Sequence, residues 1–325
     1  MPKLESLARY PLATLPTPLD PAPRLSQELG VRVLIKRDDL TGFALGGNKA
    51  RKLEFLVADA LAQGADTLVT GGGTQSNHAR MTAAAARKLG LDVTIVFFGA
   101  PPATVNGNLL LDQLLGAELV YANTDDKLET DRVVQRVADD LRARGRKPYV
   151  IPVGGSTVLG CCSYILAVGE LLAQLEAQSV KPDYVFVATG SCGTQSGILA
   201  GMKYYQAAIP VHGITVSRAK SEGVERITRL VKSTAEFLKC PMPLDPDEII
   251  INDGYLGPGY AIPTAAGNAA IRMVARLEGI FLDPVYTGKT MAGMIDLARR
   301  GEIKRGATVV FWHTGGVPAI FAIAG

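Results

Sequence analysis

Residues 184–202 read YVFVATGSCGTQSGILAGM, and this stretch decides the fold class. Its β-branched and aromatic start predicts a strand over residues 184–188, and the glycines and hydroxyl side chains after it predict a loop. The small apolar residues that follow predict the start of a helix. The polar residues in the middle argue against a membrane span. A strand that leads through a glycine-rich loop into a helix is typical of α/β proteins.

The same alternation of strand and helix extends along the chain. Patterns of helical length, such as residues 79–89, 131–144 and 265–277, separate short apolar stretches. These stretches predict strands over residues 31–35, 67–69, 93–97, 118–121, 149–151, 184–188, 211–216, 248–251 and 308–312. The alternation predicts an α/β fold whose mostly parallel sheet has helices on both faces. In such sheets, ligands bind at the carboxyl ends of the strands.

The composition is that of a globular protein close to neutrality. Among 325 residues, 34 Lys and Arg stand against 31 Asp and Glu, which gives a net charge of +3, and 47% of the residues are hydrophobic. No basic block is long enough to follow a phosphate backbone, so we expect no nucleic-acid partner. The first eleven residues lack the apolar segment of a secretory signal, and no stretch predicts a membrane partner. We therefore expect a cytoplasmic protein.

Cysteine and histidine are sparse. The chain has four Cys and three His, with no C-x-x-C spacing. Neither a disulfide framework nor a Cys/His zinc site is expected from this pattern, and we predict no metal. Cys161, Cys162 and Cys240 are interpreted as small hydrophobic core residues.

Four glycine-rich turns are candidates for ligand binding. They are residues 46–49, 71–78, 190–194 and 314–316. Residues 190–194 form the best phosphate cradle, because they follow a strand, offer the Ser191 and Thr194 hydroxyls and open a helix. An ordinary strand-to-helix turn would explain one such loop, but four in one chain favour a ligand.

The common nucleotide and hydrolase motifs are absent from the sequence. No G-x-G-x-x-G follows a strand, and no G-x-S-x-G is present. Gly288-Lys289-Thr290 resembles the end of a P-loop, but Asp283 stands where that motif has its first glycine. The predicted phosphate therefore belongs to something other than a common nucleotide.

Lys49 is the first candidate for chemistry. It follows Gly46-Gly47-Asn48 and begins a helical pattern over residues 49–62. A helix N-terminus disfavours an ammonium group, as do the neighbouring Arg51 and Lys52. A lysine with a lowered pKa can form a Schiff base, and together with a phosphate cradle it indicates pyridoxal 5′-phosphate.

Several longer segments of the sequence resemble segments of a known enzyme family. The run GGNKARKLE at residues 46–54 resembles the pyridoxal-lysine segment of the family that contains D-cysteine desulfhydrase and 1-aminocyclopropane-1-carboxylate (ACC) deaminase. Further segments that resemble this family are residues 35–39, 75–78, 148–156, 282–289 and 313–316. The family belongs to the fold type II pyridoxal enzymes, so the resemblance implies two open, mostly parallel sheets flanked by helices.

The resemblance also implies roles for individual residues. It assigns the catalytic positions to Lys49, Ser76, Tyr260 and Tyr286. It assigns cofactor binding to Lys49, Lys52, Asn77, Gly190, Ser191, Cys192, Gly193, Thr194, Tyr286 and Thr287. In this scheme Lys49 forms the Schiff base, Lys52 and residues 190–194 hold the phosphate, and Asn77 binds the phenolic oxygen. Ser76 lies near the substrate, Tyr286 flanks the ring and Thr287 faces the pyridine nitrogen.

Simpler interpretations exist for several of these residues. Ser76 could cap the helix that begins at Asn77, Tyr260 could anchor a turn, and Tyr286 could be a core aromatic residue. His78 is interpreted as a structural hydrogen-bonding residue. The segments together favour the site, and they disfavour a pyridoxal-phosphate carrier or regulatory protein without turnover.

Thr287 separates the branches of the family. ACC deaminases carry Glu at this position, where it keeps the pyridine nitrogen protonated. The neutral Thr287 is implied to suffice for β-elimination of hydrosulfide, so we expect a D-cysteine desulfhydrase that forms pyruvate and ammonia. L-cysteate sulfo-lyase, which shares the stretch at residues 74–80, and ACC deaminase stay open as alternatives. Cys161-Cys162-Ser163 departs from the Ala-Leu-Gly of relatives, which leaves the substrate open.

The resemblance further implies the organisation of the chain. Residues 1–52 and 156–325 are expected to form a large cofactor-binding domain, and residues 53–155 a small inserted α/β domain. The expected partners are a small amino-acid substrate and a second copy of the chain in a homodimer.

Overall fold

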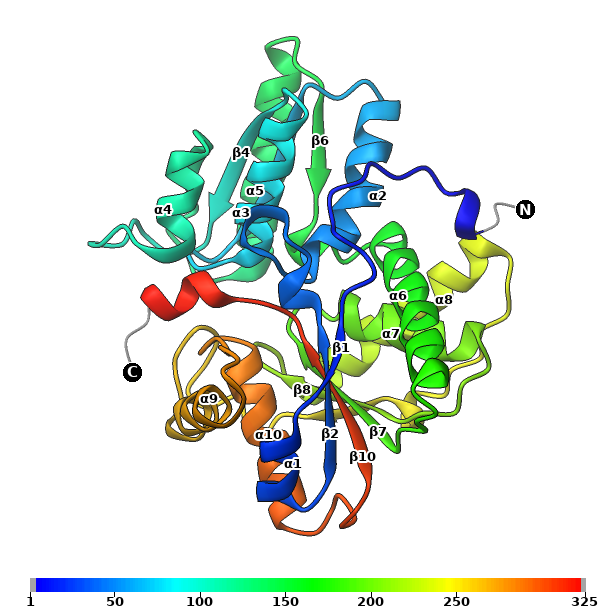
Figure 1. Cartoon of the computed structure of the whole chain (residues 1–325). Helices are drawn as coiled ribbons and strands as arrows, with labels where there is room; N and C mark the ends of the chain where they lie inside the picture. Colours follow the sequence, from blue (N-terminus) through cyan, green and yellow to red (C-terminus); the bar gives the residue numbers. More distant parts are fainter. Residues whose placement is uncertain (1–3, 323–325) are drawn as a thin grey trace.

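The larger sheet is built from both ends of the chain. The computed structural model describes residues 4–322, whose strands form two sheets (Figure 1). The order in the larger sheet is β1 (Leu19–Pro21), β2 (Arg32–Arg37), β10 (Thr308–His313), β7 (Tyr184–Thr189), β8 (Val211–Thr215) and β9 (Ile250–Asn252). All neighbours are parallel except β1, which pairs antiparallel with β2.

The smaller sheet comes from one continuous stretch between β2 and β7. Its order is β5 (Glu118–Tyr121), β4 (Asp92–Phe97), β3 (Thr67–Gly72) and β6 (Pro148–Ile151), all parallel. This stretch lies inside the range expected for the small domain. The domain boundaries stay a prediction, and Tyr10, Leu12 and Ala13 of the N-terminal part pack against the core of the smaller sheet.

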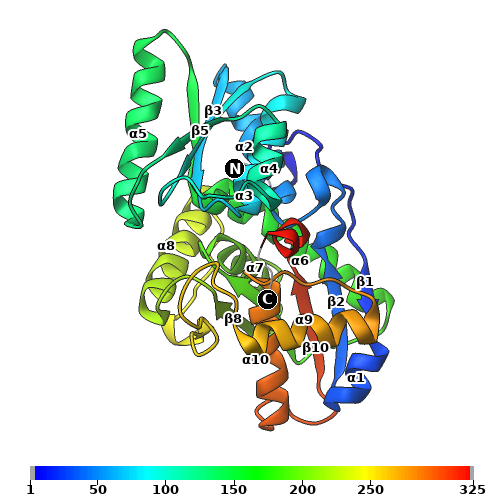
Figure 2. The same ribbon diagram turned by 90° about the vertical axis from the view of Figure 1, so that its left-hand side faces the viewer.

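Helices cover both faces of each sheet, as Figures 1 and 2 show. The core of the larger sheet joins α6 (Val158–Ala177), α7 (Gly193–Tyr204) and α8 (Lys220–Leu238) on one face. The core of its other face joins α1 (Pro23–Leu29), α9 (Ala265–Glu278) and α10 (Thr287–Arg299). The smaller sheet has α2 (Lys49–Ala62), α3 (Asn77–Lys88) and α4 (Gly107–Leu114) on one face, and α5 (Lys127–Ala143) on the other.

Short 3₁₀ helices connect these elements. They are η1 (Leu4–Ser6), η2 (Asp38–Leu40), η3 (Phe43–Leu45), η4 (Val153–Gly155), η5 (Pro246–Glu248) and η6 (Val317–Phe321). The predicted α/β fold with two mostly parallel sheets is confirmed, and each of the nine predicted strands is present. Only β1 was not predicted among the described strands.

Helix α6 is long and apolar enough to cross a membrane, but 56% of its most apolar window is buried inside the molecule. It packs against α2, α7 and α8. Glu170 on this helix pairs with Lys36 and Arg51. We therefore assign α6 to the core of the protein.

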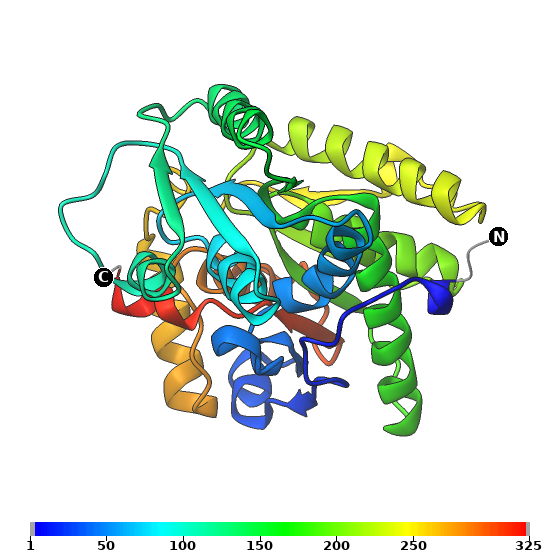
Figure 3. The ribbon, with the colours of Figure 1, turned by 90° about the horizontal axis from the view of Figure 1, so that it is seen from above.

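The two sheets point their carboxyl ends toward a common space. Helix α5 of the smaller sheet approaches the start of α8 of the larger sheet, which Figures 2 and 3 show from two directions. The loops that follow β3, β6 and β7 meet in the space between them, and this is where the candidate site lies.

Candidate active site

A cavity of about 480 Å³ lies between the two sheets. Gly72 and Gly73 reach it from the end of β3, and Gly190 and Ser191 reach it from the end of β7. Nine predicted site residues share its wall, namely Lys49, Ser76, Asn77, Gly190, Ser191, Cys192, Thr194, Tyr260 and Tyr286. Lys52, Gly193 and Thr287 do not line it. The residues were picked from segments far apart in the sequence, and the fold brings most of them together.

Lys49 enters the cavity from the first turn of α2. The loop before it requires glycine at position 46, where φ is +72° and a Cβ would lie 1.8 Å from the Asp39 carbonyl oxygen. The Asn48 N–H donates to the Thr314 carbonyl at 3.0 Å and ties this loop to the end of β10. Burial lowers the pKa of Lys49 well below its usual value, and the Lys52 charge lowers it further. The lowered pKa increases the fraction of this amine that is neutral and nucleophilic.

Ser76 caps a helix and lies in the cavity wall. Its Oγ accepts a hydrogen bond from the Ala79 N–H at 3.2 Å and so caps α3, and the residue also lines the cavity. His78 follows on the same helix. Its Nε2 lies 3.0 Å from the Thr70 hydroxyl, in agreement with the structural role predicted for it. Burial lowers the pKa of His78, as do Lys49 and Lys52, so the ring is neutral.

The loop at residues 190–194 forms a cradle at the start of α7. Cys192 has a left-handed backbone with φ of 73°, which turns the chain into the helix. Thr194 Oγ1 accepts from Asn48 Nδ2 at 3.0 Å, which leaves the Thr194 hydroxyl hydrogen for a ligand. The Gly193 N–H donates to Ser156 Oγ, and that hydroxyl donates to Ser191 Oγ at 2.7 Å. The first turn of a helix carries N–H groups without intrahelical acceptors, which favours an anion here.

Lys52 lies fully buried one turn along α2 from Lys49. Its Nζ donates to the Gly154 carbonyl at 3.1 Å and lies 5.9 Å from the Tyr164 ring centroid. Burial lowers the pKa of Lys52 to about 8. None of the ion pairs found within residues 4–322 gives this buried ammonium group a carboxylate partner. Its place close to the cradle therefore fits a group such as the phosphate of pyridoxal phosphate.

Tyr260 and Tyr286 form a hydrogen-bonded pair in the cavity wall. Their hydroxyl oxygens lie 2.6 Å apart, and the Phe98 ring packs edge-on against Tyr260 with centroids 5.9 Å apart. Burial raises the pKa of Tyr260 to about 12 and the pKa of Tyr286 well above its usual value. Both phenols therefore keep their protons near pH 7. Tyr260 lies in a turn, as the simpler interpretation expects, and both side chains also line the cavity.

Thr287 is buried behind Tyr286 at the start of α10. Its hydroxyl donates to Asp283 Oδ1 at 2.7 Å, and the same oxygen accepts from the Thr287 N–H at 2.8 Å. The other Asp283 oxygen accepts the N–H groups of Val285 and Tyr286. The role of Thr287 at the pyridine nitrogen stays a prediction. Thr314, at the end of β10, lies in the cavity wall itself.

Charged residues in the outer part of the cavity were not predicted as site residues. They are Asp125, Asp126 and Asp131 near or on α5, and Arg218, Glu222 and Arg226 near or on α8. Arg218 Nε donates to the Gly190 carbonyl at 3.1 Å, so it braces the cradle from outside. No sequence motif marks these positions, because α5 and α8 meet only in the folded chain.

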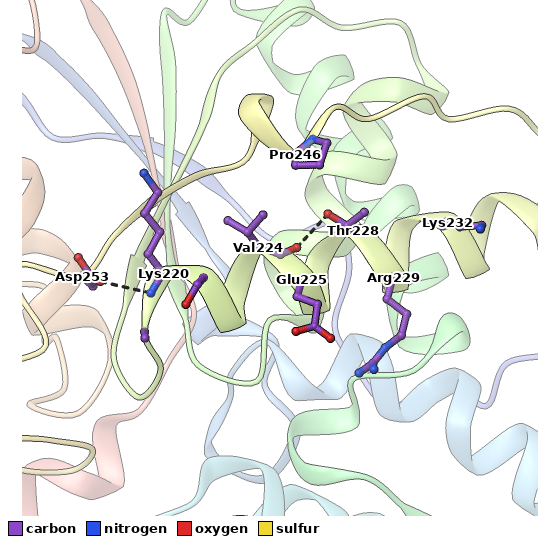
Figure 4. Close-up of a pocket in the computed structure, with 10 residues that line it drawn as sticks. Lys220, Val224, Glu225, Thr228, Arg229, Lys232, Pro246 and Asp253 are labelled. Atoms are coloured by element: carbon purple, nitrogen blue, oxygen red, sulfur yellow. Dashed lines mark hydrogen bonds between the residues drawn. The ribbon is translucent and has the colours of Figure 1, made fainter.

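A second hollow of about 910 Å³ runs along the outer face of α8 (Figure 4). Val224, Thr228 and Pro246 line it, with Lys220 and Arg229 at its edges. The Thr228 hydroxyl donates to the Val224 carbonyl of the same helix at 2.9 Å. This open hollow contains none of the predicted site residues. Within residues 4–322, no three His, Cys, Asp or Glu side chains gather as they would around a metal ion.

Comparison with known proteins gives the same family as the site chemistry. The model of the family "Pyridoxal-phosphate dependent enzyme" matches residues 11–315. A D-cysteine desulfhydrase of Klebsiella pneumoniae is 44% identical over 330 residues, covering 98% of each chain. A putative 1-aminocyclopropane-1-carboxylate deaminase of Pyrococcus abyssi is 43% identical over 324 residues, covering 98% of this chain and 96% of that protein.

Solved structures agree in fold. The crystal structure of an ACC deaminase homologue superposes with a TM-score of 0.91 at 41% identity, covering 98% of this chain and 95% of that one. A threonine deaminase from T.th. has a TM-score of 0.67 at 19% identity over 92% of each chain, which shows a shared fold alone. The fold is therefore that of the type II pyridoxal enzymes. The chain belongs to the pyridoxal-phosphate dependent enzyme family, and pyridoxal phosphate is its cofactor.

Proposed function

We propose that this enzyme is a carbon–sulfur lyase that converts D-cysteine to pyruvate, ammonia and hydrogen sulfide. The observation that carries the proposal is the meeting of Lys49, Ser76 and the Tyr260–Tyr286 pair in one cavity beside a phosphate cradle. The relatives named D-cysteine desulfhydrase, at 43–44% identity over 98% of this chain, support the substrate.

One group of residues binds the cofactor and accepts the substrate proton. Lys49 would hold the cofactor, and its amine, whose pKa burial lowers, can accept the proton from the substrate Cα. The cradle at residues 190–194 and Lys52 would hold the phosphate, and Asn77 would donate to the ring oxygen. When bound, pyridoxal phosphate withdraws electrons from the substrate Cα.

The remaining groups act on the substrate. Ser76 would face its carboxylate, and the protonated Tyr260–Tyr286 pair can donate a hydrogen bond to a leaving sulfur. A thiolate is a good leaving group, so the reaction needs no carboxylate at position 287, where a neutral threonine stands.

ACC deaminase is the second candidate, because relatives of similar identity carry that name. L-cysteate sulfo-lyase is the third, since Arg218 and Arg226 line the outer cavity and could attract a sulfonate. A carrier or regulatory protein would bind the cofactor without turnover.

Product analysis separates these candidates. The enzyme loaded with pyridoxal phosphate is incubated with D-cysteine, L-cysteine, L-cysteate or ACC, with the Lys49→Ala variant as control. We expect pyruvate and sulfide from D-cysteine at the highest kcat/KM. Faster 2-oxobutyrate formation from ACC, sulfite release from L-cysteate, or an absence of turnover would each replace the proposal with the corresponding candidate.

We also propose that the enzyme works as a cytoplasmic homodimer on a small amino acid, without nucleic acid or membrane partners. Light scattering coupled to gel filtration measures the oligomeric state. A monomeric mass would contradict the dimer.

A further inference from the structure

Asn108 lies near the start of α4, outside the cavity wall, with its side chain fully buried. Its Oδ1 accepts a hydrogen bond from Arg80 Nη1 at 3.1 Å. Its Nδ2 donates to the Gln75 carbonyl and to Asn77 Oδ1, both at 3.0 Å. The Asn108 N–H donates to Gln75 Oε1 at 2.9 Å. Asn108 therefore holds the loop on which Ser76 and Asn77 stand.

The direction of these hydrogen bonds is forced by chemistry. A guanidinium group only donates, so the Asn108 atom facing Arg80 is the oxygen. The other Asn108 atom is then the amide nitrogen, as its contact with the Gln75 carbonyl also requires. The Asn77 atom that faces this nitrogen must accept, so it is Oδ1. The polarity of Arg80 thus sets the orientation of the Asn77 amide through Asn108.

The Asn77 side chain therefore keeps its amide nitrogen, Nδ2, available as a hydrogen-bond donor. It lines the cavity, and none of the hydrogen bonds found within residues 4–322 uses its Nδ2. A flipped Asn77 would offer a carbonyl oxygen to the phenolate oxygen of the cofactor and would repel it.

We propose that Asn108 is a positioning residue that fixes the Asn77 amide with its donor available to the ring oxygen of pyridoxal phosphate. The inference rests on the role of Asn77 in the proposed function, and it concerns cofactor binding, not the choice of substrate. Arg80 is part of the same device, because its Nη2 donates to the Gly46 carbonyl at 2.9 Å. One buried guanidinium group therefore braces both the Asn77 loop and the loop that carries Lys49.

Reversal of the polarity at position 108 tests the proposal. In Asn108→Asp, the carboxylate can still accept from Arg80 but cannot donate to Asn77, so the Asn77 amide turns its nitrogen toward position 108. The matched control is Asn106→Asp. Asn106 Oδ1 accepts from Gln75 Nε2 at 3.2 Å, so a carboxylate there keeps the same contact and does not reach Asn77.

The readout is the dissociation constant of pyridoxal phosphate for the apoprotein, measured by equilibrium dialysis in a double-mutant cycle with Asn77→Ala. We expect Asn108→Asp to raise the constant at least tenfold in the wild-type background and less than twofold in the Asn77→Ala background. Asn106→Asp should change it less than twofold. The visible absorbance band of the bound cofactor should shift in Asn108→Asp alone, a change that a general loss of stability would not cause.

Three results would overturn the proposal. They are an unchanged constant in Asn108→Asp, an equal loss in both backgrounds, and an equal loss in Asn106→Asp. If Asn108→Asp does not fold, Asn108→Ala in the same cycle gives the same test, because it also removes the donor to Asn77. Substrate turnover is not part of the readout, so a wrong substrate would leave this result unaffected.

Discussion

Lys49 is the residue on which the chemistry depends. Its burial beside Lys52 lowers its pKa and keeps the amine nucleophilic. Lys49→Ala should abolish the visible cofactor band and turnover, while the protein still folds, because the Lys49 side chain lines the cavity and its truncation opens no void in the core. Borohydride reduction and peptide mapping should find the cofactor on Lys49 of the wild type.

The control for this prediction is Lys52→Met. That variant should keep the label on Lys49 while its affinity for the cofactor falls. A label on Lys52 or Lys289 of the wild type would show that the wrong lysine has been chosen.

Thr194 tests the phosphate cradle. Its oxygen accepts from Asn48, so its hydrogen is free to donate to the phosphate dianion. A hydrogen bond to a charged group contributes about 1.5–3 kcal/mol. Thr194→Val should therefore raise the dissociation constant of pyridoxal phosphate about tenfold to a hundredfold. Thr228→Val, on the outer face of α8, should leave it unchanged; equal constants for wild type and Thr194→Val would mean that the phosphate lies elsewhere.

At the scale of single residues, sequence analysis could select candidate site residues where several of them stand in one glycine-rich loop. It selected Lys49, Ser76 and residues of the cradle, because glycine turns and helix starts are local features. It did not select Asn108, whose role depends on a neighbour 31 positions away. It could not show that the Thr287 hydroxyl is bonded to Asp283, since that contact depends on how α10 begins.

Among the elements, α2 and α6 are joined by a buried ionic network. Arg51 on α2 donates to Asp38 after β2 and to Glu170 on α6, with Nη2 at 2.9 Å and 2.8 Å from their carboxylates. Asp38 also accepts from Tyr164 and Trp312. Burial opposes the ionisation of Asp38 and Glu170. Arg51 outweighs it together with Tyr164 and Trp312 at Asp38, and together with Lys36 at Glu170, so the pKa of both carboxyl groups is lowered.

This network makes a prediction about stability. Glu170→Ala removes the carboxylate that Lys36 and Arg51 share and leaves Asp38 to balance two buried positive charges; breaking a buried pair costs about 3–5 kcal/mol. Urea denaturation of the apoprotein at pH 7 should show this loss of unfolding free energy. Asp139→Ala, which removes an exposed ion pair with Arg142, should change it little. A loss no larger than that of the control would mean that the network is energetically neutral.

The sign of the pH dependence follows from the lowered pKa values. Both carboxylates stabilise the fold above the pKa of the unfolded chain, about 4, and this stabilisation is lost as the pH falls through their folded pKa values. The difference in stability between wild type and Glu170→Ala should therefore shrink toward acid pH. A difference that stays constant from pH 7 to pH 3 would contradict this account.

The strands could be predicted because each predicted strand is a short apolar stretch that stretches of helical length separate from the next one in the sequence. Strand β1 was missed for a physical reason. It has three residues, ends in a proline and pairs only with β2, so neither periodicity nor strand propensity marks it. The start of α5 was predicted four residues late, because the apolar Leu128 of its first turn is exposed and no hydrophobic periodicity marks that turn.

For the whole molecule, the cavity lies between two sheets, so a cofactor bound there should hold them together. A ligand that binds only the folded state adds about 2.7 kcal/mol at a hundredfold excess over its dissociation constant. Removal of pyridoxal phosphate should therefore lower the thermal midpoint, and adding it back should restore it. Calorimetry measures both steps. Pyridoxal, which lacks the phosphate, should restore less; an equal effect would argue against the cradle.

The charged residues in the outer part of the cavity could not be predicted from the sequence. Asp131 and Arg226 belong to helices that pack on different sheets, and they share one cavity because of the way the sheets are arranged. Nothing local in α5 or α8 marks this arrangement. Functional residues of this kind need the assembled molecule.

The loop after β6 lies so close to the cradle that it limits which residues can replace the glycines at positions 154 and 193. A side chain at Gly154 would meet Ser191 Oγ at 2.1 Å, and one at Gly193 would meet Ser156 Oγ at 2.5 Å. At Gly190 the nearest atoms are 3.6 Å away. In a saturation library sorted only for folded protein, we expect codons 154 and 193 to return glycine, while codon 190 also returns alanine. An invariant glycine at codon 154 or 193 would then record contact between two chain segments, and of these three glycines Gly190 alone would show selection for cofactor binding.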